Sequence, residues 1–79
     1  MEIEVKLFAT LRDYLPKKSD RFSCKMVWDG QARVKDILSK LNIPDEIPKI
    51  ILVNGVHGKQ DQMLKDGDVV SIFPPVAGG

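Results

Sequence analysis

The residues of this chain whose types could support chemistry lie at its last positions. Ala77, Gly78 and Gly79 have almost no side-chain volume, so a narrow channel in another protein could close around their backbone. Such a channel would reach the terminal carboxylate, which becomes a good electrophile only after conversion to an acyl phosphate anhydride. We therefore interpret this end as a reactive tail rather than as an ordinary frayed terminus.

The segment before this tail has the properties needed to anchor it. Residues 66–68 form a D-G-D turn, and residues 69–73 are mostly β-branched or aromatic. An apolar run of this kind is typical of a central strand that is covered on both faces. Pro74 and Pro75 lack backbone N–H groups, so the ladder must stop there and the chain must leave the sheet extended.

Other residue types that often carry chemistry are isolated in this sequence. Cys24, the single cysteine, lies in the apolar phase of an alternating pattern, which favours a small buried hydrophobe over a nucleophile. His57 has no Ser, Cys or second His near it and is interpreted as a surface residue. The earlier glycines are scattered turn residues without phosphate-loop spacing. We expect no metal and no cofactor bound by the chain itself.

Length and composition indicate one ordinary globular domain. The chain has 79 residues, of which 43% are hydrophobic and 29% charged, and its formal net charge is +1. These values argue against disorder and against electrostatic binding of nucleic acid. No apolar run approaches membrane-spanning length, and residues 1–7 alternate where a signal peptide would need a continuous apolar region. We expect a cytoplasmic protein with neither nucleic-acid nor membrane partners.

In the first half of the chain, periodicity predicts two strands, a helical turn or short helix, and the main helix. Residues 2–8 alternate as a half-buried strand, residues 9–15 have helical spacing before Pro16, and residues 21–28 alternate again. Because no long crossover joins them, the two strands should be antiparallel. The second strand should direct Phe22, Cys24 and Met26 to one side. The main helix is predicted from four apolar residues at i, i+3, i+4 and i+7, namely Val34, Ile37, Leu38 and Leu41.

The ends of this helix and the elements after it also have sequence signals. Arg33 stands where a Ser or Thr cap would be preferred, so we expect fraying at the helix start, whereas Asn42 and Pro44 should end it. Residues 50–53 form a strand, closed by the tight turn of residues 54–55. Residues 56–59 can return only as a short edge strand. Met63 and Leu64 supply a small apolar plug.

These elements predict an α+β fold in which one main helix packs across one face of a mixed sheet of four to five strands. The two least polar strands, residues 50–53 and 69–73, should lie inside the sheet. We divide the domain, residues 1–79, into a folded body of residues 1–74 and an extended, flexible reactive tail of residues 75–79.

Four stretches of the sequence resemble one family along essentially the whole chain. They are KLFATLRDYLP, VKDILSKL, VNG and LKDGDVVSIFPPVAGG. The resemblance is to the MoaD/ThiS-like sulfur carriers, which include the small subunit of molybdopterin synthase and its relative in thiamine biosynthesis. It implies a ubiquitin-like β-grasp fold. It also implies that an activating enzyme adenylates the C-terminal glycine, which is then converted to a thiocarboxylate.

The resemblance assigns roles to residues by position. Gly79 would carry the activated acyl group and then the sulfur, with Gly78 and Ala77 in the partner's channel. Arg12 matches a recurrent arginine of the family, and we expect it to form a structural salt bridge. Two departures are the Arg33 cap and the connector at residues 43–49, which matches no family pattern. The residues that would set the exit of the tail and contact the partner are Phe73, Pro74, Pro75 and Val76.

The resemblance also implies partners and is compatible with more than one function. An E1-like, MoeB-like adenylyltransferase would supply ATP and magnesium, and the acceptor would be the large subunit of molybdopterin synthase or another sulfur-accepting enzyme. The chain would then be a carrier and not an enzyme, gripped by an apolar patch near Phe73 and Val76. The pathway is molybdopterin or tungsten cofactor synthesis, or alternatively thiamine synthesis or another pathway. A protein modifier conjugated through Gly79 and a plain interaction module are two further functions that the sequence allows.

Overall fold

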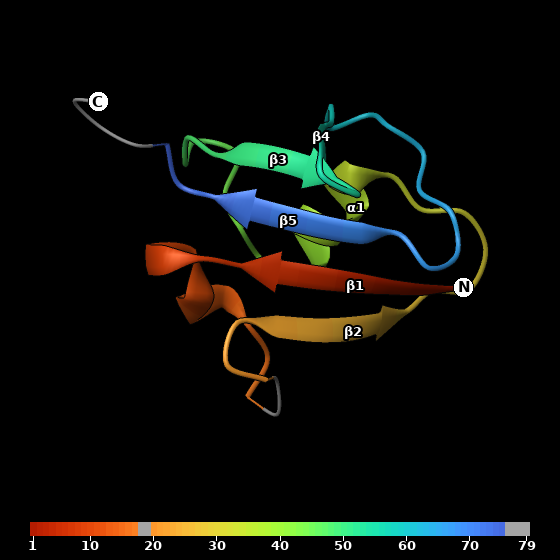
Figure 1. Ribbon diagram of the computed structural model, residues 1–79, viewed down its shortest axis with the longest axis horizontal. Helices are drawn as coiled ribbons and strands as arrows, with labels where there is room; N and C mark the ends of the chain where they lie inside the picture. Colours follow the sequence, from red (N-terminus) through yellow and green to blue (C-terminus); the bar gives the residue numbers. More distant parts are fainter. Residues whose placement is uncertain (18–19, 76–79) are drawn as a thin grey trace.

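The computed structural model describes residues 1–17 and 20–75, which form a five-stranded sheet with one α-helix on one face (Figure 1). The strands lie in the order β2-β1-β5-β3-β4. β1 and β5 are parallel, and the other neighbouring pairs are antiparallel. This confirms the predicted α+β class and the two inner strands. The elements are β1 Glu2–Leu7, the 3-10 helix η1 Ala9–Tyr14, β2 Ser23–Val27, α1 Val34–Lys40, β3 Ile50–Val53, β4 Val56–His57 and β5 Val69–Phe73.

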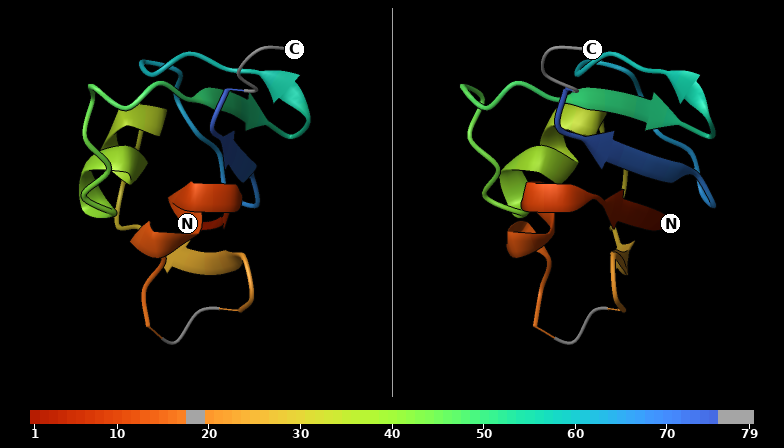
Figure 2. Two further views of the ribbon diagram at one scale, coloured as in Figure 1. Left: turned by 90° about the vertical axis from the view of Figure 1, so that its left-hand side faces the viewer. Right: turned by 60° about the vertical axis from the view of Figure 1, so that its left-hand side comes forward.

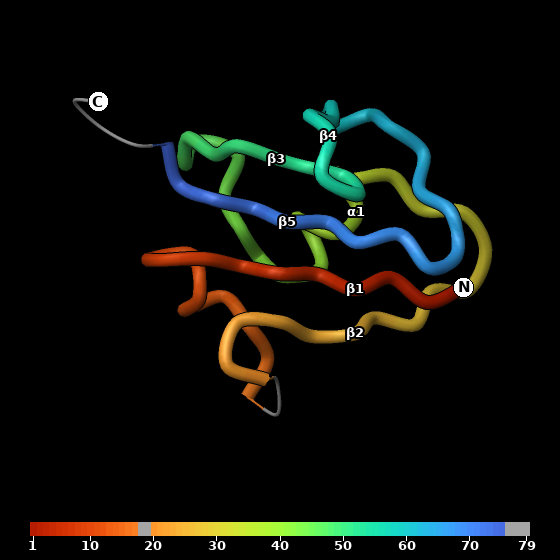
Figure 3. Tube along the Cα trace, viewed as in Figure 1, coloured from red at the N-terminus to blue at the C-terminus, as the bar shows by residue number. Residues whose placement is uncertain are grey.

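The hydrophobic core lies between the helix and the face of the sheet that it covers. The apolar stripe of α1 packs against alternate residues of the three inner strands, and the trace in Figure 3 shows the helix behind these strands. Burial of such a shared apolar surface is the main term that stabilises a small domain. The side chains with no exposed surface are those of Ile3, Val5, Leu7, Val34, Ile37, Val70 and Ile72.

The opposite face of the sheet has no helix over it in the part of the chain that the structure describes (Figure 2). Along β5, Val70 and Ile72 are buried, whereas Val69, Ser71 and Phe73 on the other face are only half-buried. The expectation that residues 69–73 are covered on both faces was therefore wrong. A single helix covers one face only, and the apolar residues on the other face remain available for contact.

The start of α1 is better held than its sequence suggests. Asp36 Oδ2 accepts a hydrogen bond of 2.7 Å from the backbone N–H of Arg33, a carboxylate at the position of a capping box. The N–H groups of Val34 and Lys35 donate to the carbonyls of Gln62 and Gln60 at 3.1 and 2.8 Å. These donors would otherwise be unpaired. The fraying expected from the Arg33 cap is therefore opposed by a segment about 27 residues away in sequence.

The end of α1 follows the predicted signal. Asn42 has φ of 61°, and its N–H donates to the carbonyl of Ser39 at 3.0 Å. The N–H of Ile43 donates to the carbonyl of Leu38, also at 3.0 Å. This pair of bonds is a Schellman motif with asparagine in the left-handed position, which asparagine tolerates better than most residues.

Two smaller predictions need correction. Leu64 is buried as expected, but Met63 is 40% exposed, so the plug consists of one residue. Phe22 does not share the half-buried environment of Cys24 and Met26 and instead stacks its ring on Phe8. Its ring is 38% exposed. Among the described residues, no helix is both long enough and apolar enough to cross a membrane.

Candidate functional site

The predicted tail leaves the sheet at the edge where two parallel strands end together. β1 and β5 run in register from Glu4 opposite Val69 to Leu7 opposite Ile72, so both reach the same edge. β5 ends at Phe73, and Pro74 and Pro75 continue without ladder structure, as the missing N–H groups require. Figure 1 shows η1 at this same edge. Four predicted site residues, Val76, Ala77, Gly78 and Gly79, lie outside the described residues.

Three phenylalanine rings are stacked at this edge and are called the aromatic stack here. The ring of Phe73 lies parallel to that of Phe8, with centroids 4.4 Å apart and an interplanar angle of 5°. Phe8 in turn stacks on Phe22, with centroids 5.3 Å apart and an angle of 27°. Stacked pairs of this kind contribute about 0.5–1.5 kcal/mol beyond the burial of their area. The stack therefore gives the last residue of β5 a defined position.

The backbone fixes the three rings side by side. Phe8 donates from its N–H to the carbonyl of Ile72 at 3.2 Å, which extends the β1 and β5 pairing by one residue. On its other side, the N–H of Leu7 donates to the carbonyl of Phe22 at 2.8 Å. The stack thus lies across three adjacent chain segments. Phe8 and Phe73 are half-buried and Phe22 is exposed, so one side of the stack remains accessible.

The open face of the sheet continues the apolar surface beyond the stack. Ile50 lies opposite Phe73 in the antiparallel pairing of β3 with β5, and Leu52 lies opposite Ser71. Both side chains are half-buried. Partly exposed apolar residues that adjoin on one face are a common basis for protein recognition. The described residues near Phe73 therefore form a half-buried apolar surface that includes residues of β3, and its role as a partner patch stays a prediction.

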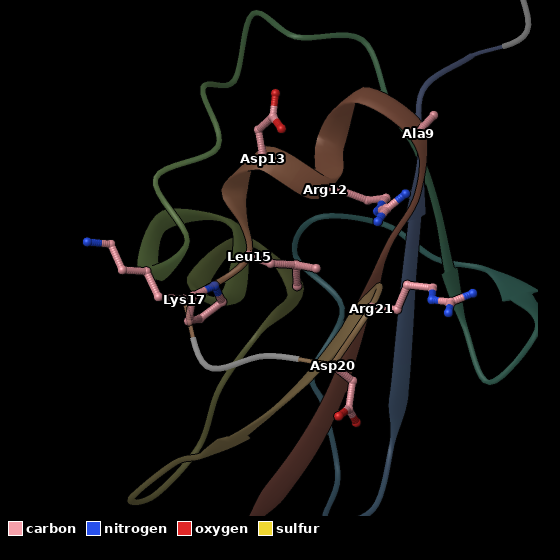
Figure 4. A pocket seen from close by; sticks show the side chains of 8 residues that line it. Ala9, Arg12, Asp13, Leu15, Lys17, Asp20 and Arg21 are labelled. Carbon is pink, nitrogen blue, oxygen red and sulfur yellow. The ribbon is translucent and has the colours of Figure 1, made fainter.

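A hollow of about 340 Å³ lies beside this edge, between η1 and the start of β2 (Figure 4). Its lining includes the guanidinium groups of Arg12 and Arg21. Arg12 is exposed and forms no ion pair with any residue that the structure describes, so the expected salt bridge is not found there. The hollow is open to solvent, which makes it unlike a closed ligand pocket.

The other candidate residues of the sequence lie away from this edge or inside the fold. Cys24 is half-buried and packs against the core, consistent with a packing role. His57 is exposed on the short edge strand β4, opposite Leu52. Within residues 1–17 and 20–75, no three His, Cys, Asp or Glu side chains are grouped in a way that could hold a metal ion.

Sequence reasoning identified Phe73 but missed Phe8 and Phe22 as parts of the site. Phe8 was treated as the last residue of an alternating strand, and Phe22 as a buried residue of the next strand. A usable signal was present, because each of the three aromatic residues lies at one end of a strand: Phe8 follows β1, Phe22 precedes β2 and Phe73 is the last residue of β5. The pairing of β1 with β5 across about 65 residues was needed to bring them together.

The sequence of the chain matches one family model and one named relative over nearly all of its length. The sequence model of the ThiS family matches residues 5–79. Small archaeal modifier protein 3 from Haloferax volcanii is 39% identical to the chain over an alignment that covers all of both proteins.

Solved structures show the same arrangement of elements. A Pyrococcus furiosus protein named for subunit 1 of molybdopterin converting factor has a TM-score of 0.75 and 29% identity, over 95% of this chain and 98% of its own. Small archaeal modifier protein 1 from Haloferax volcanii, named SAMP1, has a TM-score of 0.76 and 26% identity over the full length of both chains. The names of these relatives indicate two kinds of function, one in cofactor assembly and one in protein modification.

Proposed function

This chain belongs to the ThiS family of ubiquitin-like β-grasp proteins, and from that premise we propose that it is a sulfur carrier activated at Gly79. The observation that carries the proposal is the family match, which runs through the P-P-V-A-G-G ending to residue 79. The position of Phe73 supports it, because a stacked ring at the end of β5 gives the tail a fixed point of departure.

In the proposed reaction, the carboxylate oxygen of Gly79 attacks the α-phosphorus of ATP and pyrophosphate leaves. The product is an acyl adenylate. Hydrosulfide delivered on the partner side then attacks the acyl carbon, AMP leaves with the bonding electron pair, and loss of the sulfur-bound proton leaves a thiocarboxylate on Gly79. Magnesium, phosphate binding and positioning come from the activating enzyme, an E1-like, MoeB-like adenylyltransferase. The carrier contributes a reactive end and a surface that the enzyme can grip.

The docking surface for this partner is proposed to be the aromatic stack with the adjoining residues of β3. The apolar face beside Phe73 is open, and Pro74 and Pro75 lead the chain away from it. A partner that covers the stack would also be placed to receive Pro74, Pro75, Val76, Ala77 and Gly78. Desolvated aromatic residues at the centre of an interface often dominate its binding energy.

The receiving pathway is proposed to be molybdopterin or tungsten cofactor synthesis, with the large subunit of molybdopterin synthase as the acceptor. Support comes from the relative named as subunit 1 of molybdopterin converting factor, which is 29% identical to this chain. In this role the chain would be a subunit and co-substrate rather than a catalyst. Sulfur delivery to thiamine synthesis or to another acceptor uses the same carrier chemistry and differs only in the acceptor.

Intact-mass spectrometry tests the carrier chemistry. The protein should be co-expressed with its cognate activating enzyme, and we expect a species in which one oxygen of Gly79 is replaced by sulfur. A matched variant with one residue added after Gly79 should show no such species, because its new terminus lacks the recognised ending. A thiocarboxylate on the untrimmed extended variant, or none on the parent chain, would contradict the proposal.

A second function, conjugation to other proteins, is favoured by the 39% identity to small archaeal modifier protein 3. Here the amine of a target lysine would attack the acyl carbon of the adenylate, AMP would leave with the bonding electron pair, and an isopeptide bond to Gly79 would form after loss of a proton from the amine. Denaturing electrophoresis of cell extracts with an antibody against the chain separates the two functions. Higher-mass bands that disappear when Gly78 and Gly79 are deleted would support conjugation. A single band at the mass of the free chain would leave sulfur transfer as the proposed role.

A further inference from the structure

The hollow beside the aromatic stack is lined by two arginine side chains. Arg12 lies on η1 and Arg21 just before β2, and neither forms an ion pair with a residue that the structure describes. Two carboxylates, those of Asp13 and Asp20, also line the hollow. In Figure 4, both guanidinium groups extend toward the side where β5 passes, whereas the two carboxylates point away at opposite ends.

This arrangement leaves the two guanidinium groups on one side of the hollow, apart from the two carboxylates. Exposed Arg and Asp residues within one hollow could have formed ion pairs with each other, although such surface pairs contribute little to stability. Here the carboxylates are directed elsewhere, so the fork-shaped donors of both guanidinium groups remain available. Such donors match the geometry of a carboxylate better than a lysine amine does.

Both arginines belong to chain segments that adjoin residues of the aromatic stack. Arg21 directly precedes Phe22, and η1, which carries Arg12, begins directly after Phe8. The hollow therefore adjoins the segments that carry Phe8 and Phe22, within reach of a protein that covers the stack. An apolar centre bordered by charged residues is the usual composition of a protein interface.

We propose that Arg12 and Arg21 bind an acidic segment of the activating enzyme when it docks on the aromatic stack. The inference rests on the proposed function, since it concerns the same partner and the same edge of the sheet. A small free anion fits less well, because the hollow is open and water competes for exposed guanidinium groups. A docking protein excludes that water and strengthens charge-assisted hydrogen bonds within the interface.

Steady-state kinetics of adenylation test this assignment. The carrier with Arg12→Glu and Arg21→Glu should be titrated against the activating enzyme, with release of pyrophosphate as the signal. Charge reversal at an interface acts mainly on association, so we expect KM for the carrier to rise about tenfold or more with kcat within about twofold. Raising the salt concentration should weaken binding of the parent carrier to the activating enzyme more than binding of the variant.

Lys17→Glu is the matched control. Lys17 lines the same hollow, but its side chain points away from the two guanidinium groups (Figure 4). Reversal of the charge at Lys17 should change KM by less than about threefold. This result would separate local recognition by the two arginines from a general loss of positive charge. Thermal unfolding should show that all variants remain folded, as expected for exposed side chains.

The outcomes separate this inference from the function on which it rests. If the parent carrier releases no pyrophosphate with the enzyme, the proposed function fails and the inference fails with it. If the parent is adenylated but the double variant has an unchanged KM, or if Lys17→Glu raises KM equally, only the arginine assignment is overturned. A selective rise in KM for the double variant supports it.

Discussion

The two ends of strand β5 are held by different kinds of interaction. At its start, the carboxylate of Asp68 accepts hydrogen bonds from Asn54 Nδ2 at 2.9 Å and from the N–H of Lys65 at 2.8 Å, while the N–H of Val69 donates to Asn54 Oδ1 at 2.9 Å. At its end, Phe73 is held by ring stacking on Phe8.

This difference between hydrogen bonding and ring stacking indicates which end of β5 is available to a partner protein. The hydrogen-bonding groups of Asn54 and Asp68 are already paired with each other and with nearby backbone, so a partner gains little there. The rings at the other end have an accessible side, and the hollow lined by Arg12 and Arg21 also includes Ala9, the residue after Phe8. We therefore expect changes at the start of β5 to affect stability, and changes at its end to affect recognition.

The largest effect on stability is expected in the strand between these ends. Ile72 has no exposed surface, and its replacement in Ile72→Ala should lower the free energy of unfolding by about 2–5 kcal/mol through lost burial and a new cavity. The matched variant Ile72→Val should cost about 0.5–1.5 kcal/mol. Urea unfolding followed by circular dichroism measures both. Equal effects of the two variants would contradict the close packing assigned to this position.

Sequence reasoning was most successful for the elements around this core. Alternation in residues 2–8 and the apolar stripe of Val34, Ile37 and Leu38 depend on local periodicity, and each element formed where it was expected. The central position of β5 was also predicted, because a strand with nearly all residues apolar is expected to have a neighbouring strand on each side. These features follow from neighbouring residues alone.

Features that depend on distant pairing could not be predicted in the same way. The D-G-D turn was identified, but its Asp68 bonds to Asn54, which is 14 residues away in sequence. The start of α1 looked poorly capped because its additional partners, the carbonyls of Gln60 and Gln62, belong to a later loop. Likewise, the aromatic stack combines three segments. A single position in the sequence does not reveal which distant groups the fold will bring to it.

A smaller effect on stability is expected at the hydrogen-bonded start of β5. Asp68→Ala removes two hydrogen bonds to the carboxylate and should lower the free energy of unfolding by about 1–2 kcal/mol, because these bonds lie near the surface. The KM for adenylation should stay unchanged below the melting temperature. Asp61→Ala is the control, since the carboxylate of Asp61 accepts no hydrogen bond from the described residues and the side chain is exposed.

A change in KM for Asp68→Ala would argue against the separation of the two ends. It would mean that the partner contacts the start of β5, or that loss of the bonds between Asp68 and its neighbours displaces Phe73. NMR chemical shifts of the Phe73 ring distinguish these cases, because a displaced strand changes the stacking of Phe73 on Phe8, whereas a lost partner contact leaves it unchanged.

The smallest effect on stability, with a larger effect on recognition, is expected at the outer ring of the stack. Phe22 is 38% exposed and is the outer ring of the stack, so Phe22→Ala should cost about 0.5–1.5 kcal/mol of folding free energy. If the partner covers this ring, its loss should raise KM for the carrier about fivefold, equivalent to about 1 kcal/mol of binding.

Val27→Ala provides the comparison for this last variant. Val27 belongs to β2, which Phe22 precedes by one residue, and it is 82% exposed, but it lies at the opposite end of that strand from the aromatic stack. Its truncation removes exposed apolar area without touching the proposed docking edge, so KM should not change. If Val27→Ala raises KM as much as Phe22→Ala does, the partner grips the outer strand as a whole. Recognition would then not be confined to the end of the sheet where β1 and β5 finish together.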